Sequence, residues 1–299
     1  MKRSKSDVIF DTVVYAFLIL FLIVVIYPLY FTVIASVSDP NATAMGETFF
    51  WFKGFHLDAY KNVFINEQIW TGYYNSIIYV VVGTVYALAI TISCAYAMSR
   101  RGLKGKNILM GVFVFTMYFG GGLIPFYLVI SKLGMINSRA ALIVPAGFSV
   151  FNMIVTRTFF SSSFPEELYE AAQIDGCSEI GIFARIALPL SKAIIAVIGL
   201  FVAVGHWNSY FGALLFLSDN GKWPLQLVLR SILIMNQQLA MDLTWVTNMD
   251  QIQFLTLKTR MAETMKYSLI FISSAPMLIA YPFVQKHFVK GVMIGSLKG

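Results

Sequence analysis

Six long apolar segments alternate with more polar stretches along this chain of 299 residues. A helix needs about 20 apolar residues to cross the hydrocarbon layer of a membrane, and the segments are near that length. The pattern therefore predicts an all-α, polytopic membrane protein, a single transmembrane domain with six transmembrane helices. The predicted spans cover residues 13–37, 75–98, 107–131, 140–156, 193–217 and 267–284.

Two of the predicted spans contain residues that disturb a regular helix. The third contains Gly120-Gly121-Gly122 followed by Pro125, which predicts a broken or closely packed helix and a candidate hinge. The fourth is the shortest and contains Pro145 and Gly147.

The composition agrees with a membrane protein and narrows the partners. The chain is 58% hydrophobic and only 12% charged, whereas soluble domains contain roughly 25% charged residues. The net charge of +7 does not indicate nucleic acid, because the basic residues lie in short clusters beside apolar spans. The two cysteines, Cys94 and Cys177, are far apart in the sequence and provide neither a disulfide framework nor a metal site.

The basic residues also predict how the spans cross the membrane, because short cytoplasmic loops are rich in lysine and arginine. Such clusters lie before the first span, at residues 100–106, and after the last span. With six spans these clusters share one side, so both termini are predicted to be cytoplasmic. The connection of residues 157–192 and the tail of residues 285–299 then face the cytoplasm too. The first apolar run is too long for a cleavable signal, so we expect it to be retained.

The connection of residues 157–192 is predicted to form helix, turn and helix. Ser161-Ser162-Ser163 precede Pro165 and two glutamates, which is typical of a helix start. This helix should stop at Asp175-Gly176, and Ser178-Glu179 can start a second short helix. Leu188-Pro189 should then redirect the chain, because the residue before a proline is disfavoured in a helix.

The first of these helices has the composition of a docking surface. Leu168, Ala171 and Ala172 are spaced to share one face, and alanine lets another backbone approach closely. The acidic residues around them are Glu167, Glu170 and Asp175. A small apolar face with an acidic rim suits either a groove on a partner protein or packing on the chain's own loops, and these residues alone leave both open.

A family resemblance favours the partner. One motif in this connection consists of Glu170-Ala171-Ala172, three residues, Gly176, nine residues, and then Ile186-Ala187-Leu188-Pro189. This motif resembles the EAA loop of binding-protein-dependent ABC importer permeases. In that family this loop forms the coupling helix, which sits in a cleft of the ATP-hydrolysing subunit. The resemblance implies that the docking residues are Glu167, Glu170, Ala171, Ala172, Asp175 and Gly176. Cys177 departs from the family, where alanine is common.

Two further stretches resemble the carbohydrate branch of the family. Asp175 before Gly176 and Leu190 after Pro189 are similar to that branch, and residues 281–299 resemble the tail of maltose-type permease subunits. The resemblance implies that the tail contacts the ATPase through Gly291, Gly295 and Ser296. The alternative is a frayed basic end near anionic lipid.

The resemblance also implies a function and a set of partners. It implies a permease subunit in the bacterial cytoplasmic membrane that moves a carbohydrate, expected to be an oligosaccharide, by alternating access. The implied partners are a second homologous permease, two ATP-binding subunits, an extracytoplasmic solute-binding protein and the lipid bilayer. Alternatives are a permease of the same type for a non-sugar solute, a receptor, or a membrane-embedded enzyme.

The chain lacks the residues that an enzyme or ATPase would need. No G-x-x-x-x-G-K-[ST] phosphate-binding loop occurs in it, so ATP and magnesium are expected on the partner ATPase subunits. Its three histidines are scattered, and the spans contain no acidic residue that could join a catalytic set. We therefore expect no catalytic residue, metal site or cofactor on this chain.

Polar residues inside the spans are the candidates for a translocation path, because such groups usually face the bundle interior or water. The predicted path residues are Asn152, His206, Asn208 and Tyr210. Aromatic faces and amides also suit sugar rings. The alternative is hydrogen bonding between helices of this chain and its partner permease.

Overall fold

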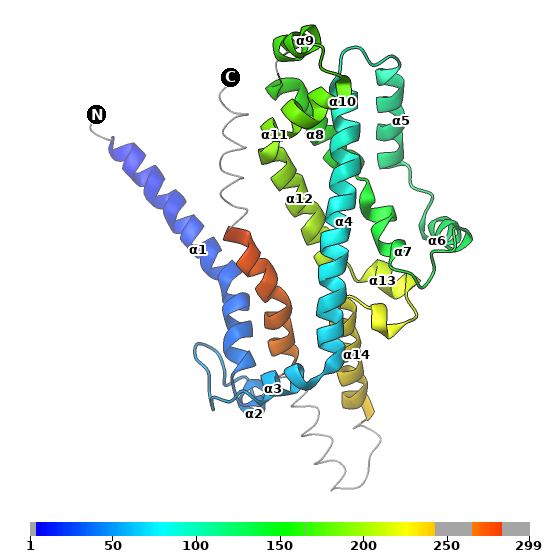
Figure 1. The fold of residues 1–299 in the computed structure, drawn as a ribbon. Helices are drawn as coiled ribbons and strands as arrows, with labels where there is room; N and C mark the ends of the chain where they lie inside the picture. Colours follow the sequence, from blue (N-terminus) through cyan, green and yellow to red (C-terminus); the bar gives the residue numbers. More distant parts are fainter. Residues whose placement is uncertain (1–3, 165, 243–264, 283–299) are drawn as a thin grey trace. The chain divides into compact units, whose positions relative to one another are not determined.

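A computed structural model describes residues 4–164, 166–242 and 265–282 of the chain (Figure 1). All regular secondary structure in these ranges is helical, as the apolar pattern predicts. The chain divides into two compact units. Unit 1 contains residues 1–67 and 229–275, and unit 2 contains residues 68–228 and 276–299.

Unit 1 is built around the N-terminal helix α1 (Lys5–Ser36). Ser4 caps this helix, and Asp7 completes a capping box with it, so the first free backbone N–H groups have partners. The short helices α2 (Pro40–Ala44) and α3 (Asp58–Ile65) follow. Ser36 and Tyr60 share a hydrogen bond of 2.7 Å between their hydroxyls, which attaches the end of α1 to α3.

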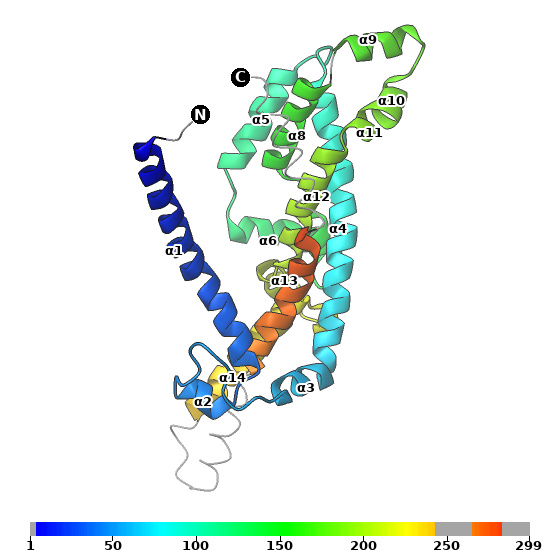
Figure 2. The same cartoon turned by 90° about the vertical axis from the view of Figure 1, so that its left-hand side faces the viewer.

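Helix α4 (Glu67–Ser99) is the long element of unit 2. Toward its C-terminal end, Ile92 and Met98 belong to a buried cluster with Met153 and Phe160 of α8 (Val150–Ser163). Nearer its N-terminal end, Tyr79 belongs to a second cluster with residues of α6 (Leu123–Lys132), α7 (Ala140–Ile143) and α13 (Phe211–Phe216). Figures 1 and 2 show α9 (Glu166–Ile174), α10 (Glu179–Ile182) and α11 (Leu188–Leu190) at one end of α4 and α13 toward the other.

Two glycines let neighbouring segments pack closely against α4. A Cβ atom on Gly83 would lie 2.3 Å from Nε2 of His206, on α12 (Lys192–Trp207). A Cβ atom on Gly147 would lie 2.1 Å from Cε1 of Tyr86. Both distances are far inside van der Waals contact, so these helices can pack this closely only because the glycines carry no side chain.

The third predicted span is not one straight helix. It consists of α5 (Lys106–Tyr118) and α6 (Leu123–Lys132), whose axes differ by 113°. The break falls at Gly120–Gly122, where Gly122 adopts a φ of +85°. No atom lies within 4 Å of a Cβ built on Gly120 or Gly122, so the glycines mark a break in the helix and not a close approach. Their use as a hinge stays a prediction.

The fourth and fifth predicted spans are also interrupted. The fourth contains α7 (Ala140–Ile143), the 3-10 turn η1 (Pro145–Gly147) and α8, with a bend of 43°. Helix α8 continues to Ser163, seven residues beyond the predicted end at 156. In the fifth, α12 ends at Trp207 and α13 (Phe211–Phe216) follows. Helix α14 (Leu225–Asp242) comes next.

The described residues confirm a multi-pass helical protein but not the number of crossings. Helices α1 and α4 are long and apolar enough to span a membrane, and three bent pairs would raise the number to five. A further helix over residues 265–282 covers most of the predicted sixth span at 267–284. The count of six therefore stays a prediction.

The contact between Gly83 and His206 gives a stability test. Gly83→Ala should lower the thermal unfolding midpoint of the detergent-solubilised protein, because overpacking a tight contact costs about 1–3 kcal/mol. Gly111→Ala on α5 is the matched control, since nothing lies within 4 Å of its added methyl group. There the better helix propensity of alanine should stabilise by about 0.5–1 kcal/mol.

A second variant checks the cause. His206→Ala removes the ring that a Cβ on Gly83 would meet, so Gly83→Ala should cost little in a His206→Ala background. If both glycine replacements shift the midpoint equally, or if the double variant shows simple additivity, the close approach does not hold α12 against α4.

Candidate functional site

The loop between α8 and α12 has the predicted helix, turn and helix. Helix α9 (Glu166–Ile174) is followed by Gly176 with a φ of +74°. The Gly176 N–H donates to the Gln173 carbonyl at 3.0 Å and the Cys177 N–H to the Ala172 carbonyl at 2.9 Å, so the last carbonyls of α9 have partners. Ser178 then caps α10 (Glu179–Ile182). A β-branched residue at 176 would be strained in this left-handed conformation.

Two details of the predicted loop are wrong. Ser161, Ser162 and Ser163 do not start a helix, because they form the last turn of α8. Leu188 stays helical, with φ −61° and ψ −48°. A π-helical turn (Phe183–Ala187) precedes it and α11 (Leu188–Leu190) follows. The wider turn leaves room for Pro189, and the chain instead bends by 80° before Lys192.

Helix α9 presents its acidic residues outward and one alanine inward. Ala172 is buried in the same cluster as Ile182, so the predicted shared face of Leu168, Ala171 and Ala172 is only partly right. Glu167, Glu170 and Ala171 are exposed. Asp175 and Gly176 are exposed at the turn, and Ile174 beside them is 86% exposed. The outward face therefore combines carboxylates with a small and a large apolar side chain.

A small hydrogen-bond network holds α9 to α10. The Tyr169 hydroxyl donates to the Glu179 carboxylate, and Gln173 Nε2 donates to the Tyr169 oxygen at 3.0 Å. The hydrogen bond to Glu179, with partial burial, raises the pKa of Tyr169 to about 12. The tyrosine is therefore a neutral hydrogen-bond donor at neutral pH.

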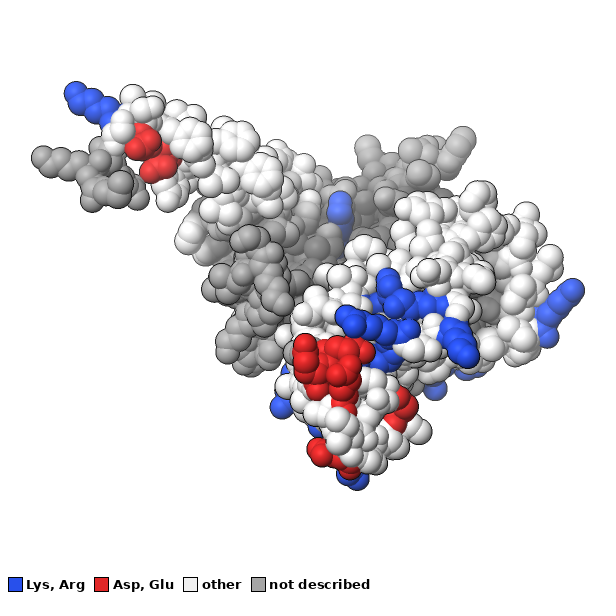
Figure 3. All heavy atoms as spheres, turned by 90° about the horizontal axis from the view of Figure 1, so that it is seen from above, with Lys and Arg blue, Asp and Glu red and all other residues white. Residues whose placement is uncertain are grey.

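Opposite charges meet on the surface beside α9. Seen from above, acidic side chains gather next to a group of basic ones (Figure 3). Nε of Arg101, in the loop after α4, lies 3.8 Å from Oε2 of Glu166 at the start of α9. The Arg101 side chain is largely exposed, so this ion pair contributes little to stability.

The structure separates the predicted path residues. His206 is buried against Gly83 of α4, and its place in a path stays a prediction. Asn208 is the C-terminal cap of α12 and Tyr210 the N-terminal cap of α13. Both lie at the break between these helices and are exposed. Asn152 lies half-buried on α8, in a different element.

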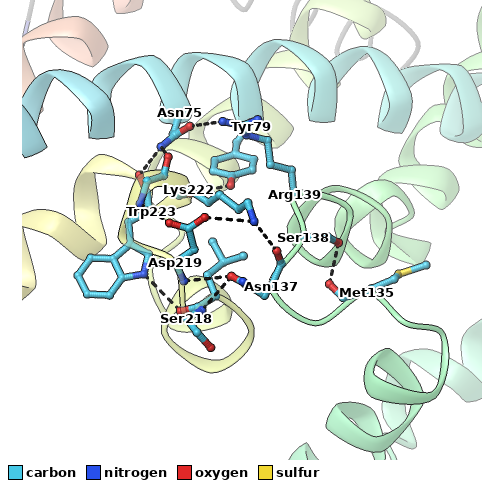
Figure 4. A network of polar contacts seen from close by, with 12 residues as sticks. Asn75, Tyr79, Met135, Asn137, Ser138, Arg139, Ser218, Asp219, Lys222 and Trp223 are labelled. Carbon is cyan, nitrogen blue, oxygen red and sulfur yellow. Dashed lines mark hydrogen bonds and ion pairs between the residues drawn. The ribbon is translucent and has the colours of Figure 1, made fainter.

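A polar network at the other end of α4 was missed by sequence reasoning (Figure 4). Asn75 Nδ2 donates to the carbonyls of Gly221 at 2.8 Å and Trp223 at 3.1 Å. Arg139 Nη2 donates to Asn75 Oδ1 at 2.8 Å. The Tyr79 hydroxyl donates to the Lys222 carbonyl at 2.7 Å. Asn75 is completely buried, so its amide uses these partners in place of water.

Asn137 completes this network from the turn before α7. Its φ of +56° is unusual for a residue other than glycine. Its side-chain oxygen accepts from the backbone N–H groups of Ser218, at 3.2 Å, and Asp219, at 3.0 Å. The Gly221 N–H and the Lys222 ammonium lower the pKa of Asp219. The sequence signal for this turn is weak. It is an asparagine, a residue that tolerates the left-handed conformation, placed shortly before a helix.

The remaining predicted site residues lie in the tail. Gly291, Gly295 and Ser296 lie outside the described residues. Within the part of the chain that the structure describes, no group of three histidine, cysteine, aspartate or glutamate side chains is placed to hold a metal ion.

Helices α1 and α4 are long and apolar enough to cross a membrane, and the acidic helix α9 is exposed outside them, so the class is a helical membrane protein. The chain belongs to the family of binding-protein-dependent transport system inner membrane components, whose sequence pattern matches residues 87–294. It is thus a multi-pass inner membrane protein, the permease of an ABC transporter and not its ATPase.

Three relatives extend the match to nearly the whole chain. Protein LplC of Bacillus subtilis (strain 168) is 42% identical over 100% of this chain and 98% of its own length. The polygalacturonan/rhamnogalacturonan transport system permease protein YtcP of the same organism is 38% identical over 97% of this chain and 99% of its own. The crystal structure of a bacterial ABC transporter that imports the acidic polysaccharide alginate contains a chain with 31% identity and a TM-score of 0.85. That match covers 96% of this chain and 99% of the other.

Proposed function

We propose that this chain is the permease subunit that carries an oligosaccharide across the membrane in an ATP-driven importer. The single observation that supports this most is the exposed, acidic helix α9, ended by Gly176 in the left-handed conformation, in a chain of the permease family. Two similar proteins are named for the transport of sugar polymers, polygalacturonan/rhamnogalacturonan and alginate.

The proposed assembly contains this chain, a second homologous permease, two ATP-binding subunits and a solute-binding protein. ATP and magnesium bind to the ATP-binding subunits, which close on ATP and carry α9 with them. The spans attached to α9 then change from facing inward to facing outward, which couples two distant sites through one movement. The tail at Gly291, Gly295 and Ser296 makes a further contact with the ATP-binding subunits.

The substrate class is tested on the purified complex with its solute-binding protein. That protein should retain sugars from a panel of pectin- and alginate-derived oligosaccharides and maltotriose. If it retains none of the panel and binds a solute that is not a sugar, the oligosaccharide proposal is wrong, although the permease assignment stands.

The proposed dock is Glu167, Glu170, Ala171, Asp175 and Gly176, without the buried Ala172. Ala171→Trp places a bulky ring where backbones must approach closely. Glu170→Lys puts a like charge opposite a basic partner. Both variants should insert and pair with the second permease but copurify with less of the ATP-binding subunits, on the order of tenfold less for a loss of about 1.4 kcal/mol.

Ala184→Trp is the matched control for this docking test, since Ala184 is exposed in the same loop but lies outside the proposed dock. It should retain the ATP-binding subunits. Equal retention in Ala171→Trp, Glu170→Lys and the parent protein would show that α9 is not the dock.

The membrane orientation has its own test. We expect α9 and both termini to be cytoplasmic, in line with the basic clusters. In a Cys94→Ala, Cys177→Ala background, a cysteine at Asn220 should react with an impermeant thiol reagent in intact cells, and a cysteine at Ser4 should not. The reverse labelling pattern would invert the orientation and remove α9 from the cytoplasm.

Asn208 and Tyr210 are the proposed path residues, because both are exposed at the break between α12 and α13. Asn208→Ala and Tyr210→Ala should lower sugar uptake about 5- to 100-fold at an unchanged amount of assembled complex, the range for loss of one binding contact. Tyr210→Phe, which keeps the ring, should retain more uptake than Tyr210→Ala. If uptake falls only in proportion to assembly, these residues are structural.

A further inference from the structure

Arg100, the residue after α4, lies between three aromatic rings from three separate segments. Its Cζ atom is 5.0 Å from the ring centroid of Tyr96 on α4 and 4.9 Å from that of Phe164. It is 5.1 Å from the ring centroid of Tyr169 on α9. Phe164 is the residue that ends α8. One guanidinium group therefore contacts α4, the end of α8 and α9 through favourable cation–π geometry.

The contacts of Arg100 are mainly with these rings. Its Nε donates to the adjacent Ser99 hydroxyl at 3.2 Å, and its Nη1 is buried without a hydrogen-bond partner. The two carboxylates closest to this region have other partners, because Glu179 accepts from Tyr169 and Glu166 lies near Arg101. The guanidinium is thus held mainly by cation–π contacts, and its broad, delocalised charge differs from the compact, strongly hydrated ammonium of a lysine.

The space beside this aromatic cage is not filled by protein. A cavity of about 660 Å³ lies between the end of α4 and the segment of α9 and α10, lined by Ala97, Arg100, Gln173 and Ile180 among others. Close packing transmits displacement between elements, and it is incomplete here. The connection of α9 to α4 therefore depends on this cage and on the buried cluster that Ala172 shares with Met98, with the exposed Arg101–Glu166 pair as a weak addition.

We propose that Arg100 is a positioning residue, whose cage with Tyr96, Phe164 and Tyr169 makes α9 and the end of α4 move together. The proposal rests on the proposed function of α9 as the dock for the ATP-binding subunits. Displacement of α9 by those subunits is transmitted through the cage to α4, the helix against which α8 and α12 pack. Without the cage, α9 moves into the adjacent cavity and α4 does not follow.

The test uses the complete complex reconstituted in liposomes, with the binding protein and the oligosaccharide of the panel that it retains. Arg100→Lys keeps the charge but loses the planar face, and Tyr169→Leu removes one ring. Both should keep the ATP-binding subunits and ATP hydrolysis, while sugar imported per ATP falls about tenfold, as expected for the loss of a coupling element.

Two control variants separate the effect of the ring contacts from other effects. Tyr169→Phe removes only the hydroxyl that donates to Glu179 and should import as much sugar per ATP as the parent. Arg101→Lys alters the neighbouring arginine, which is exposed, and should also import normally. Spin labels at Ala89 on α4 and Ile174 on α9 should show a single distance through the ATP cycle in the parent and a broadened distribution in Arg100→Lys.

Three outcomes would contradict the proposed role of this cage. The first is that Arg100→Lys imports as much sugar per ATP as the parent. The second is that Tyr169→Phe and Tyr169→Leu lose sugar import per ATP equally. The third is that Arg100→Lys and Tyr169→Leu both lose the assembled complex, which would make the residues merely structural. If the proposed dock on α9 is wrong, Ala171→Trp retains the ATP-binding subunits. That result distinguishes failure of the dock from failure of the cage.

Discussion

The structure depends on one constraint, that backbone N–H and C=O groups inside a membrane must find partners within the protein. Helix α4 meets it with 33 continuous helical residues, and the clusters of unit 2 form on that helix. The breaks at Gly120–Gly122 and at residues 208–210 release backbone groups from the helical pattern. Such breaks are tolerated where protein or a water-filled cavity covers them. The proposed path residues Asn208 and Tyr210 flank the second break.

The two ends of α4 are attached to their surroundings in different ways. Around Asn75 the attachment is a network of hydrogen bonds in which buried polar atoms have partners (Figure 4). Around Arg100 it is a cation among rings beside an open cavity. A satisfied polar network specifies one arrangement, because every displaced donor is costly. Cation–π contacts hold one guanidinium against several rings at once, which suits the proposed transmission of a movement from α9 to α4.

The sequence predicted much of the candidate site because the necessary signals are local. Gly176 ends α9 through its own backbone freedom, and Ser178 caps α10 through its own hydroxyl. The role of Ser161–Ser163 was mistaken, because serine is also accepted in the last turn of a helix. The inward side of α9 could not be predicted either, since Ala171 and Ala172 differ only in which neighbours surround them.

By itself the sequence determined the helical class, the apolar segments and the helix–turn–helix of the loop, because hydropathy, capping and glycine conformation act over a few residues. Only the tertiary structure decided that His206 faces Gly83, that Asn75 contacts residues near position 222, and that Arg100 meets Phe164 and Tyr169. The residues in these contacts are far apart in the sequence, from 64 positions for Arg100 and Phe164 to 148 positions for Asn75 and Trp223. Such pairs depend on how whole helices pack, and no local pattern records that.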